Sequence, residues 1–200
     1  NDTLTIREPD DWHVHLRDGK MLALALDFTS RQFARAIVMP NLVPPVVNAE
    51  MAMAYKGRIE AARPKGSSFE PLMTLFLTNQ TTPQDIIDAK QAGVTACKLY
   101  PAGATTNSDA AVKGIQALYP VFQAMQEQGL LLLIHGEVTE HHIDIFDREK
   151  VFIDTHLGPI VDAFPKLKVV FEHITTADAA SFVAGASEFV GATITPQHLL

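Results

Sequence analysis

The sequence predicts an α/β fold of the TIM (β/α)₈ barrel type, and three observations lead to this prediction. Short apolar segments alternate with longer segments of helical composition through all 200 residues, as expected for successive βαβ units with right-handed crossovers. Several apolar segments, residues 131–134 for example, are continuously apolar, which is typical of parallel strands covered on both faces. Polar side chains recur where these segments end, and barrel enzymes assemble their sites at the carboxyl ends of their strands.

The strand candidates are seven short apolar segments, at residues 12–15, 34–39, 72–77, 95–99, 131–134, 168–171 and 191–194. An open doubly wound sheet is the competing architecture for this alternation. Such a sheet usually carries a glycine-rich phosphate-binding loop after its first strand. Here Trp-His-Val-His occupies residues 12–15 instead, so the barrel is favoured.

Helix signals separate these strands. Thr82 is a capping residue followed by proline at the first helical position and by Asp85 in an acidic first turn, and Gly93 follows the end of that helix. Further helices are predicted at residues 51–62, 120–128 and 176–183, and residues 147–164 could form one interrupted helix. No linker or internal repeat divides the chain, so residues 1–200 are expected to form a single barrel domain.

Composition excludes several functional classes. Sixteen basic against 23 acidic residues give a formal net charge of −7, and the chain has no basic block of the kind that binds nucleic acid or an anionic membrane. Its longest apolar run, residues 21–26, is far shorter than the ~20 residues that span a bilayer. The single cysteine, Cys97, cannot form an internal disulfide, and the first residues do not resemble a signal peptide. A cytoplasmic location is therefore predicted.

His13 and His15 are the first candidate functional residues. They are two apart in an apparent strand, so both side chains should leave the same face. Two imidazoles directed into one space suit a divalent metal ion, most often zinc. If the strand extends, Arg17 has the same parity and would place a guanidinium suited to a carboxylate beside the metal. The alternative is a pair of partly exposed strand histidines.

Lys98 lies near the end of a strand that is otherwise apolar. A bare ammonium directed into the barrel would be repelled by metal ions and costly to desolvate. Reaction with carbon dioxide would convert the amine into a carbamate, an anion whose two oxygens can bridge two metal ions. The alternative is a lysine that reaches solvent or pairs with an acid. The neighbouring Cys97 has the opposite parity and is assigned to packing.

His135 and His173 end two further strands. Either one alone would be explained as a structural histidine with satisfied hydrogen bonds. Four histidines and a lysine at the ends of four separate strands are less easily explained by chance. Together they favour a binuclear metal site.

Five motifs then resemble those of the dihydroorotase family, in the shorter bacterial-type branch that belongs to the amidohydrolase superfamily. They are WHVHLRD at residues 12–18, MPN at 39–41, KLYP at 98–101, HGE at 135–137 and FEHITT at 171–176. The resemblance extends through essentially all 200 residues with the motifs in the family's order. As a set they are specific, although His-x-His alone occurs in many metallohydrolases.

The resemblance implies a metal-dependent hydrolase barrel with two zinc ions bridged by an N6-carboxylated Lys98. His13 and His15 would bind the more buried zinc, and His135 and His173 the second. It also implies a substrate site whose residues hold the substrate carboxylate, lie close to the substrate or belong to a loop that closes over it: Arg17, Asn41, His15, His135, Thr105 and Thr106.

The implied reaction is the reversible cyclisation of N-carbamoyl-L-aspartate to L-dihydroorotate in pyrimidine synthesis, carried out by a homodimer. The family's catalytic aspartate comes from the last barrel strand, and no residue up to Leu200 matches it. The chain is therefore expected to be an N-terminal portion that lacks the last strand or strands and is inactive alone. Two alternatives are another cyclic amidohydrolase, of the hydantoinase or dihydropyrimidinase type, and a non-catalytic barrel that binds metal or a partner.

Overall fold

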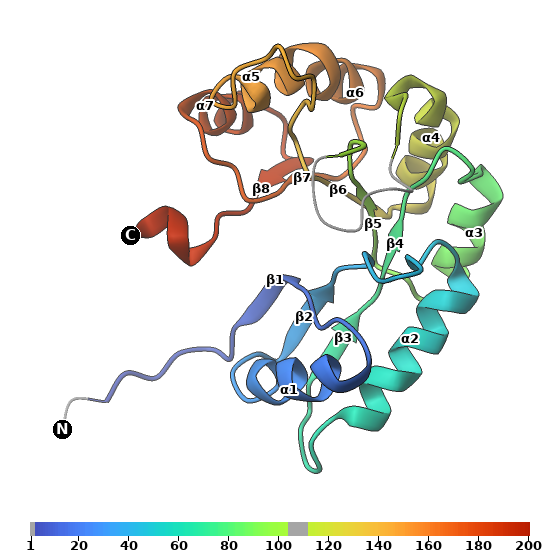
Figure 1. The fold of residues 1–200 in the computed structure, drawn as a ribbon, viewed down its shortest axis with the longest axis vertical. Helices are drawn as coiled ribbons and strands as arrows, with labels where there is room; N and C mark the ends of the chain where they lie inside the picture. The colour runs from blue at the N-terminus through green and yellow to red at the C-terminus, as the bar shows by residue number, and fades with distance from the viewer. Residues whose placement is uncertain (1–2, 104–111) are drawn as a thin grey trace.

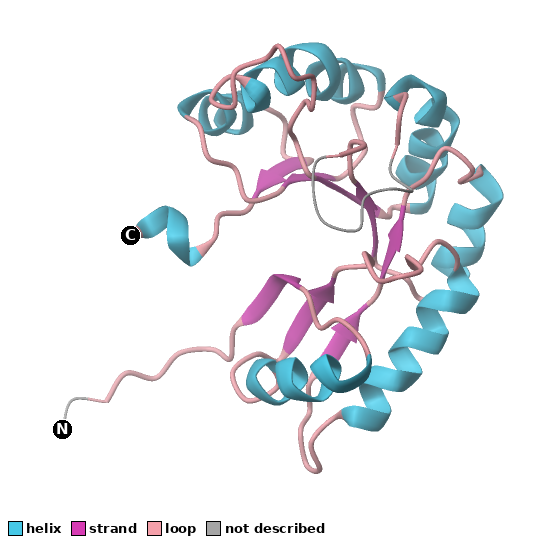
Figure 2. Cartoon of the chain, viewed as in Figure 1, coloured by secondary structure: helices cyan, strands magenta, loops and turns pink. Residues whose placement is uncertain are grey.

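A computed structural model describes residues 3–103 and 112–200. Its strands lie on the inside of a curved arrangement and its helices form an outer layer (Figures 1 and 2). The strands are β1 (Asp10–Val14), β2 (Arg35–Val38), β3 (Glu70–Leu72), β4 (Thr74–Phe76), β5 (Ala96–Leu99), β6 (Leu131–Ile134), β7 (Val169–Phe171) and β8 (Val190–Ala192). The α-helices are α1 (Gly19–Thr29), α2 (Ala49–Ala62), α3 (Pro83–Gln91), α4 (Tyr119–Gln128), α5 (Arg148–Phe152), α6 (Gly158–Ala163) and α7 (Ala177–Gly185).

All strand pairs are parallel, and each strand pairs with the one that follows it in the chain, except at one point. The order is β1-β2-β3 in one sheet and β4-β5-β6-β7-β8 in the other. Because only Met73 separates β3 from β4, the two segments make one interrupted strand. The result is the strand sequence of a (β/α)₈ barrel, with β1 and β8 as the outer strands of the described residues (Figure 1).

Local sequence signals explain the helix boundaries. Thr82 and Asp85 form a reciprocal capping box at the start of α3, which satisfies main-chain N–H groups that have no partner inside the helix. Thr176 caps α7 through one hydrogen bond, which its side chain accepts from the N–H of Ala179. The predicted interrupted helix is confirmed: α5 and α6 are joined by a π-helical turn over Ile153–Leu157.

The structure corrects the expected extension of the first strand. β1 ends at Val14, so strand parity does not place Arg17. Arg17 instead has a φ of 59°, in the left-handed region that non-glycine residues rarely adopt. Asp18 follows and caps α1, a helix that the sequence signals did not predict.

Alternating side chains divide each inner strand between two environments. On β5, Cys97 and Leu99 belong to the main apolar cluster, which also contains helix residues such as Tyr55, as predicted for Cys97. Ala96 packs in a smaller cluster with Leu133. Lys98 shares the parity of Ala96, so it projects into the interior of the curved sheet. None of the described helices is long and apolar enough to cross a membrane.

Candidate metal centre

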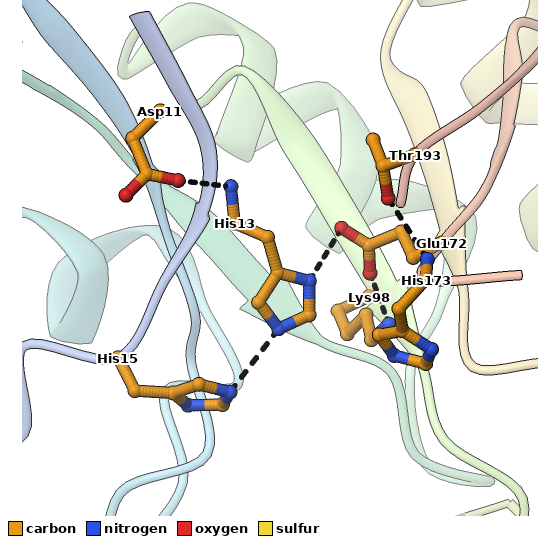
Figure 3. Close-up of polar contacts among 7 residues, drawn as sticks. All are labelled: Asp11, His13, His15, Lys98, Glu172, His173 and Thr193. Atoms are coloured by element: carbon orange, nitrogen blue, oxygen red, sulfur yellow. Dashed lines mark hydrogen bonds and ion pairs between the residues drawn. The ribbon is translucent and has the colours of Figure 1, made fainter. Parts of the chain in front are cut away.

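His13 and His15 direct the same ring atom to one point. Their Nε2 atoms lie 3.1 Å apart (Figure 3), within hydrogen-bonding distance. Zinc–nitrogen bonds of 2.0–2.1 Å in a tetrahedral site place two ligand nitrogens about 3.3 Å apart, so the observed spacing also fits two ligands of one ion. His13 belongs to β1, and His15 follows the end of this strand.

Lys98 lies at the centre of the cluster, and its side chain is fully buried. Its ammonium is paired with the equally buried carboxylate of Glu172, and its Nζ lies 4.9 Å from the ring centre of Tyr100. Burial lowers the pKa of Lys98, although the charge of Glu172 opposes this change. Without carboxylation, Lys98 therefore pairs with an acid, which is the predicted alternative.

Glu172 connects this lysine to the first histidine. Its Oε1 lies 2.9 Å from His13 Nδ1, and its Oε2 contacts Lys98 (Figure 3). Burial raises the pKa of Glu172, but Lys98 and His13 outweigh burial and bring the value to about 2. The carboxylate is therefore ionised at neutral pH.

His135 and His173 complete the ring of nitrogen donors. The ring centre of His173 lies 4.8 Å from that of His135 and 5.3 Å from that of His13. His173 has a φ of 42°, and its main-chain N–H donates to Thr193 Oγ1 at 2.9 Å. His135 Nε2 is buried and has no hydrogen-bond partner among the described residues, although Glu137 Oε1 lies 3.6 Å away.

These nitrogens fit a divalent metal ion. Like His135 Nε2, His15 Nδ1 is buried and has no hydrogen-bond partner among the described residues. Such a nitrogen is unusual unless it binds a ligand. Burial is the main cause that lowers the pKa of His135 to about 3 and those of His15 and His173 to about 4. All three imidazoles are therefore neutral at neutral pH, the form in which histidine binds metal. His13 and His173 also offer ring nitrogens within 4.8 Å of each other.

Two of the predicted substrate-binding residues lie beside His15. Asn41 is buried. Burial and the charges of His13 and Arg17 lower the pKa of His15, while the side chain of Asn41 raises it. The Tyr55 hydroxyl donates to the main-chain oxygen of Arg17. The predicted Thr105 and Thr106 lie outside the described residues.

The gap of about 640 Å³ between β1 and the segment that follows β8 is the open side of the partial barrel. His13, His15 and His173 lie in its wall, together with Trp12 and Thr193. The histidine cluster is therefore exposed on this open side.

Two buried glutamates, Glu149 and Glu172, are not among the residues predicted from the sequence. Glu172 stands within one of the recognised motifs, and a charged residue between an apolar strand and His173 was the available signal. Glu149, from α5, accepts hydrogen bonds from the main-chain N–H groups of Thr175 and Thr176 at 3.1 and 2.9 Å. It thereby fixes the loop that connects His173 to α7.

Four histidines and a buried lysine come together at the ends of parallel strands, and this donor set suits a metal centre. The profile of the Amidohydrolase family matches residues 20–193, and the chain belongs to this family. Membership implies a metal cofactor, in agreement with the donor set described above.

The most similar relatives that we compared are dihydroorotases. Those of Shewanella woodyi and Pseudoalteromonas atlantica are each 70% identical over 197 residues, which are 98% of this chain and 57% of each relative. The crystal structure of dihydroorotase from Campylobacter jejuni has a TM-score of 0.88 and 41% identity, and covers 96% of this chain and 55% of that protein. The predicted resemblance is confirmed, and the chain spans little more than half the length of these relatives.

Two further solved structures show how far the similarity in fold and sequence extends. Dihydroorotase from Saccharomyces cerevisiae, solved in complex with 5-fluoroorotic acid, has a TM-score of 0.88 and 33% identity over 96% of this chain and 57% of that protein. The L-hydantoinase of Arthrobacter aurescens has a TM-score of 0.73 at 17% identity, over 95% of this chain and 47% of that protein, and this shows a common fold alone. Together these structures confirm the predicted TIM-barrel class, here as a partial barrel.

Proposed function

We propose that the natural polypeptide containing this chain is a dihydroorotase, which interconverts N-carbamoyl-L-aspartate and L-dihydroorotate in pyrimidine biosynthesis. The observation that carries this proposal is the juxtaposition at His15: a metal-type nitrogen cluster on one side, and Arg17 and Asn41 on the other. A guanidinium and an amide suit a substrate carboxylate. Relatives with the name dihydroorotase, at 70% identity, support the same substrate.

The proposed cofactor is a pair of zinc ions bridged by N6-carboxylated Lys98. His13 and His15 would hold one ion, and His135 and His173 the other. When bound, the ions would supply an activated water and polarise the ring carbonyl. Carboxylation joins the uncharged Nζ of Lys98 to the carbon of CO₂ and releases one N–H proton to solvent, and the resulting anion can lie between two cations.

The substrate would lie beside these residues. Arg17 and Asn41 would orient its carboxylate, His15 and His135 would lie close to its ring, and Thr105 and Thr106 would close over it. Fixing the reacting amide in this way lowers the entropic part of the barrier. No residue among 1–200 is proposed as the proton-transferring base.

We further propose that residues 1–200 belong to one barrel domain of a homodimer that works in the cytoplasm. The main apolar cluster supports the single domain, because it includes residues from β2 and β7, such as Val38 and Phe171. The free, buried Cys97 is consistent with a reducing compartment.

A substrate comparison tests the function. The natural polypeptide should turn over L-dihydroorotate and N-carbamoyl-L-aspartate far faster than hydantoin or dihydrouracil, which lack the carboxylate. Arg17→Gln should raise KM for dihydroorotate at least about tenfold and leave the zinc content unchanged. Preference for the neutral rings would indicate a hydantoinase or dihydropyrimidinase. A folded protein that binds no zinc would indicate a non-catalytic module.

A further inference from the structure

Glu172 joins two candidate metal ligands that come from different strands. Its Oε1 lies 2.9 Å from His13 Nδ1 at β1, and its Oε2 contacts Lys98 Nζ on β5. The side chains of Glu172 and Lys98 are both fully buried. Each oxygen of one carboxylate therefore serves one candidate ligand, at the point where β7 ends (Figure 3).

Glu172 accepts from N–H groups of His13 and Lys98 that would remain after these two residues bind metal. An imidazole that binds a metal through Nε2 keeps its hydrogen on Nδ1, and such a hydrogen is commonly donated to a carboxylate. A carbamate formed on Lys98 Nζ binds metal through its oxygens and keeps one N–H. Glu172 can therefore contact His13 and Lys98 both before and after the site is loaded, with the ion pair to Lys98 replaced by a hydrogen bond from the carbamate N–H.

We propose that Glu172 is a positioning residue for the metal centre, one that orients His13 and the carbamate of Lys98 together without being a metal ligand. The proposal rests on the proposed metal centre and adds a residue to it. By accepting from Nδ1, Glu172 fixes the tautomer of His13 that leaves Nε2 free to bind. By accepting from Nζ, it sets the direction in which the carbamate oxygens of Lys98 project.

The other acidic groups near the site lack this arrangement. Glu149 is buried but accepts from Thr175 and Thr176 rather than from a candidate ligand. Glu137 is partly exposed and lies 3.6 Å from His135 Nε2. Among the acidic side chains of the described residues, only Glu172 contacts the side chains of two of the five predicted ligands.

The test compares Glu172→Gln and Glu172→Asp with the natural polypeptide and with Cys97→Ala. In Glu172→Gln, the amide NH₂ would face an N–H donor of His13 or Lys98, where the carboxylate oxygen now accepts. In Glu172→Asp, the side chain is one methylene too short to reach both partners. Zinc affinity is measured by competition with a chromophoric chelator, and the carbamate by ¹³C NMR after growth with ¹³C-bicarbonate. Both Glu172 variants should bind zinc about 10–100-fold more weakly and show a weaker carbamate signal. Cys97→Ala removes packing on the opposite face of β5, so it should lower thermal stability without changing zinc affinity.

Glu172→Asp keeps a negative charge opposite Lys98, so it stays informative even if Glu172→Gln does not fold. Wild-type zinc affinity and carbamate signal in folded Glu172→Asp would overturn the proposal. So would a zinc affinity in Cys97→Ala that is reduced as much as in Glu172→Asp. Neither readout uses the substrate, so the absence of dihydroorotate turnover would count against the proposed function and leave this test unaffected.

Discussion

The hydroxyl of Tyr55 donates a hydrogen bond of 2.6 Å to the main-chain oxygen of Arg17. Tyr55 is a buried residue of α2, and Arg17 has the left-handed φ of 59°. Arg58 of the same helix forms an ion pair with Asp18 at 2.9 Å. A non-glycine residue in this region costs about 1–3 kcal/mol and persists only where its surroundings fix it. Helix α2 therefore holds the backbone that aims the proposed carboxylate-binding guanidinium.

Replacement of Tyr55 by phenylalanine should weaken substrate binding more than it slows turnover. The change leaves a buried carbonyl at Arg17 without its partner, a loss of about 1–3 kcal/mol. We expect KM for dihydroorotate to rise about 5- to 10-fold, with a smaller change in kcat and no change in zinc content. Tyr119→Phe, in the outer helix α4, is the matched control. An unchanged KM in folded Tyr55→Phe would show that α2 does not position Arg17.

Replacement of Lys98 by alanine should remove the bridging anion from the loaded site and, in the zinc-free protein, the cation that faces buried Glu172. We expect zinc loss and, for the zinc-free protein, a stability decrease of about 3–5 kcal/mol, the usual effect of breaking a buried ion pair. Short carboxylic acids should restore part of the activity, because they can supply the two missing oxygens. Zinc content is measured by elemental analysis, and rescue by titration with acetate or propionate. Unchanged zinc content would remove the bridging role from Lys98.

Replacement of Gly136 by alanine should disturb the site through packing alone. A Cβ at this position would lie 1.8 Å from Cε2 of the buried Phe171 ring, and overpacking of this kind costs about 1–3 kcal/mol. Gly136 follows His135, so the adjustment should also lower zinc affinity. Gly57→Ala is the control, because it meets no atom within 4 Å and lies inside α2, where alanine adds about 0.5–1 kcal/mol. Equal urea midpoints for the two variants would contradict the prediction.

The zinc-free protein should lose stability as the pH falls below about 6.5. Burial holds the pKa of His15 and His173 near 4 and that of His135 near 3, whereas an unfolded histidine titrates at about 6.5. Between these values the unfolded chain binds protons that the folded chain does not, so the free energy of unfolding decreases with falling pH. The penalty is absent above about pH 6.5 and complete below about pH 3.

Urea unfolding at about pH 7.5 and about pH 5.5, with a chelator present, measures this slope. His135→Gln should make the slope shallower. His141→Gln should not, because that side chain is exposed. A midpoint that is constant over this range would show that the buried histidines take up protons without unfolding.

Short-range signals predicted the helices and strands well, because their causes are local. Thr82, Asp85 and the proline between them cap α3 as expected, and Gly129 ends α4 with a left-handed φ of 68°. The exact parity beyond the first strand could not be predicted, because β1 ends at Val14 and Arg17 then adopts a conformation that a hydrogen bond from α2 supports. Sequence spacing cannot show a contact between residues 38 positions apart.

The site was predicted from strand ends, and the structure brings the predicted histidines and Lys98 together. Their roles as ligands stay predictions. Glu172 could not be assigned from its position in the sequence, because its two partners lie 159 and 74 residues away. Only the curvature of the sheet, which is a property of the whole chain, places the three side chains in contact.

The 159-residue separation between His13 and Glu172 also affects how the molecule would gain stability from zinc. An ion held near this contact joins β1 to the end of β7, so its binding free energy opposes uncurling of the sheet between them rather than fraying of one turn. Thermal midpoints should therefore rise with free zinc concentration as a single cooperative transition. Zinc occupancy would then report whether the ring of strands has come together.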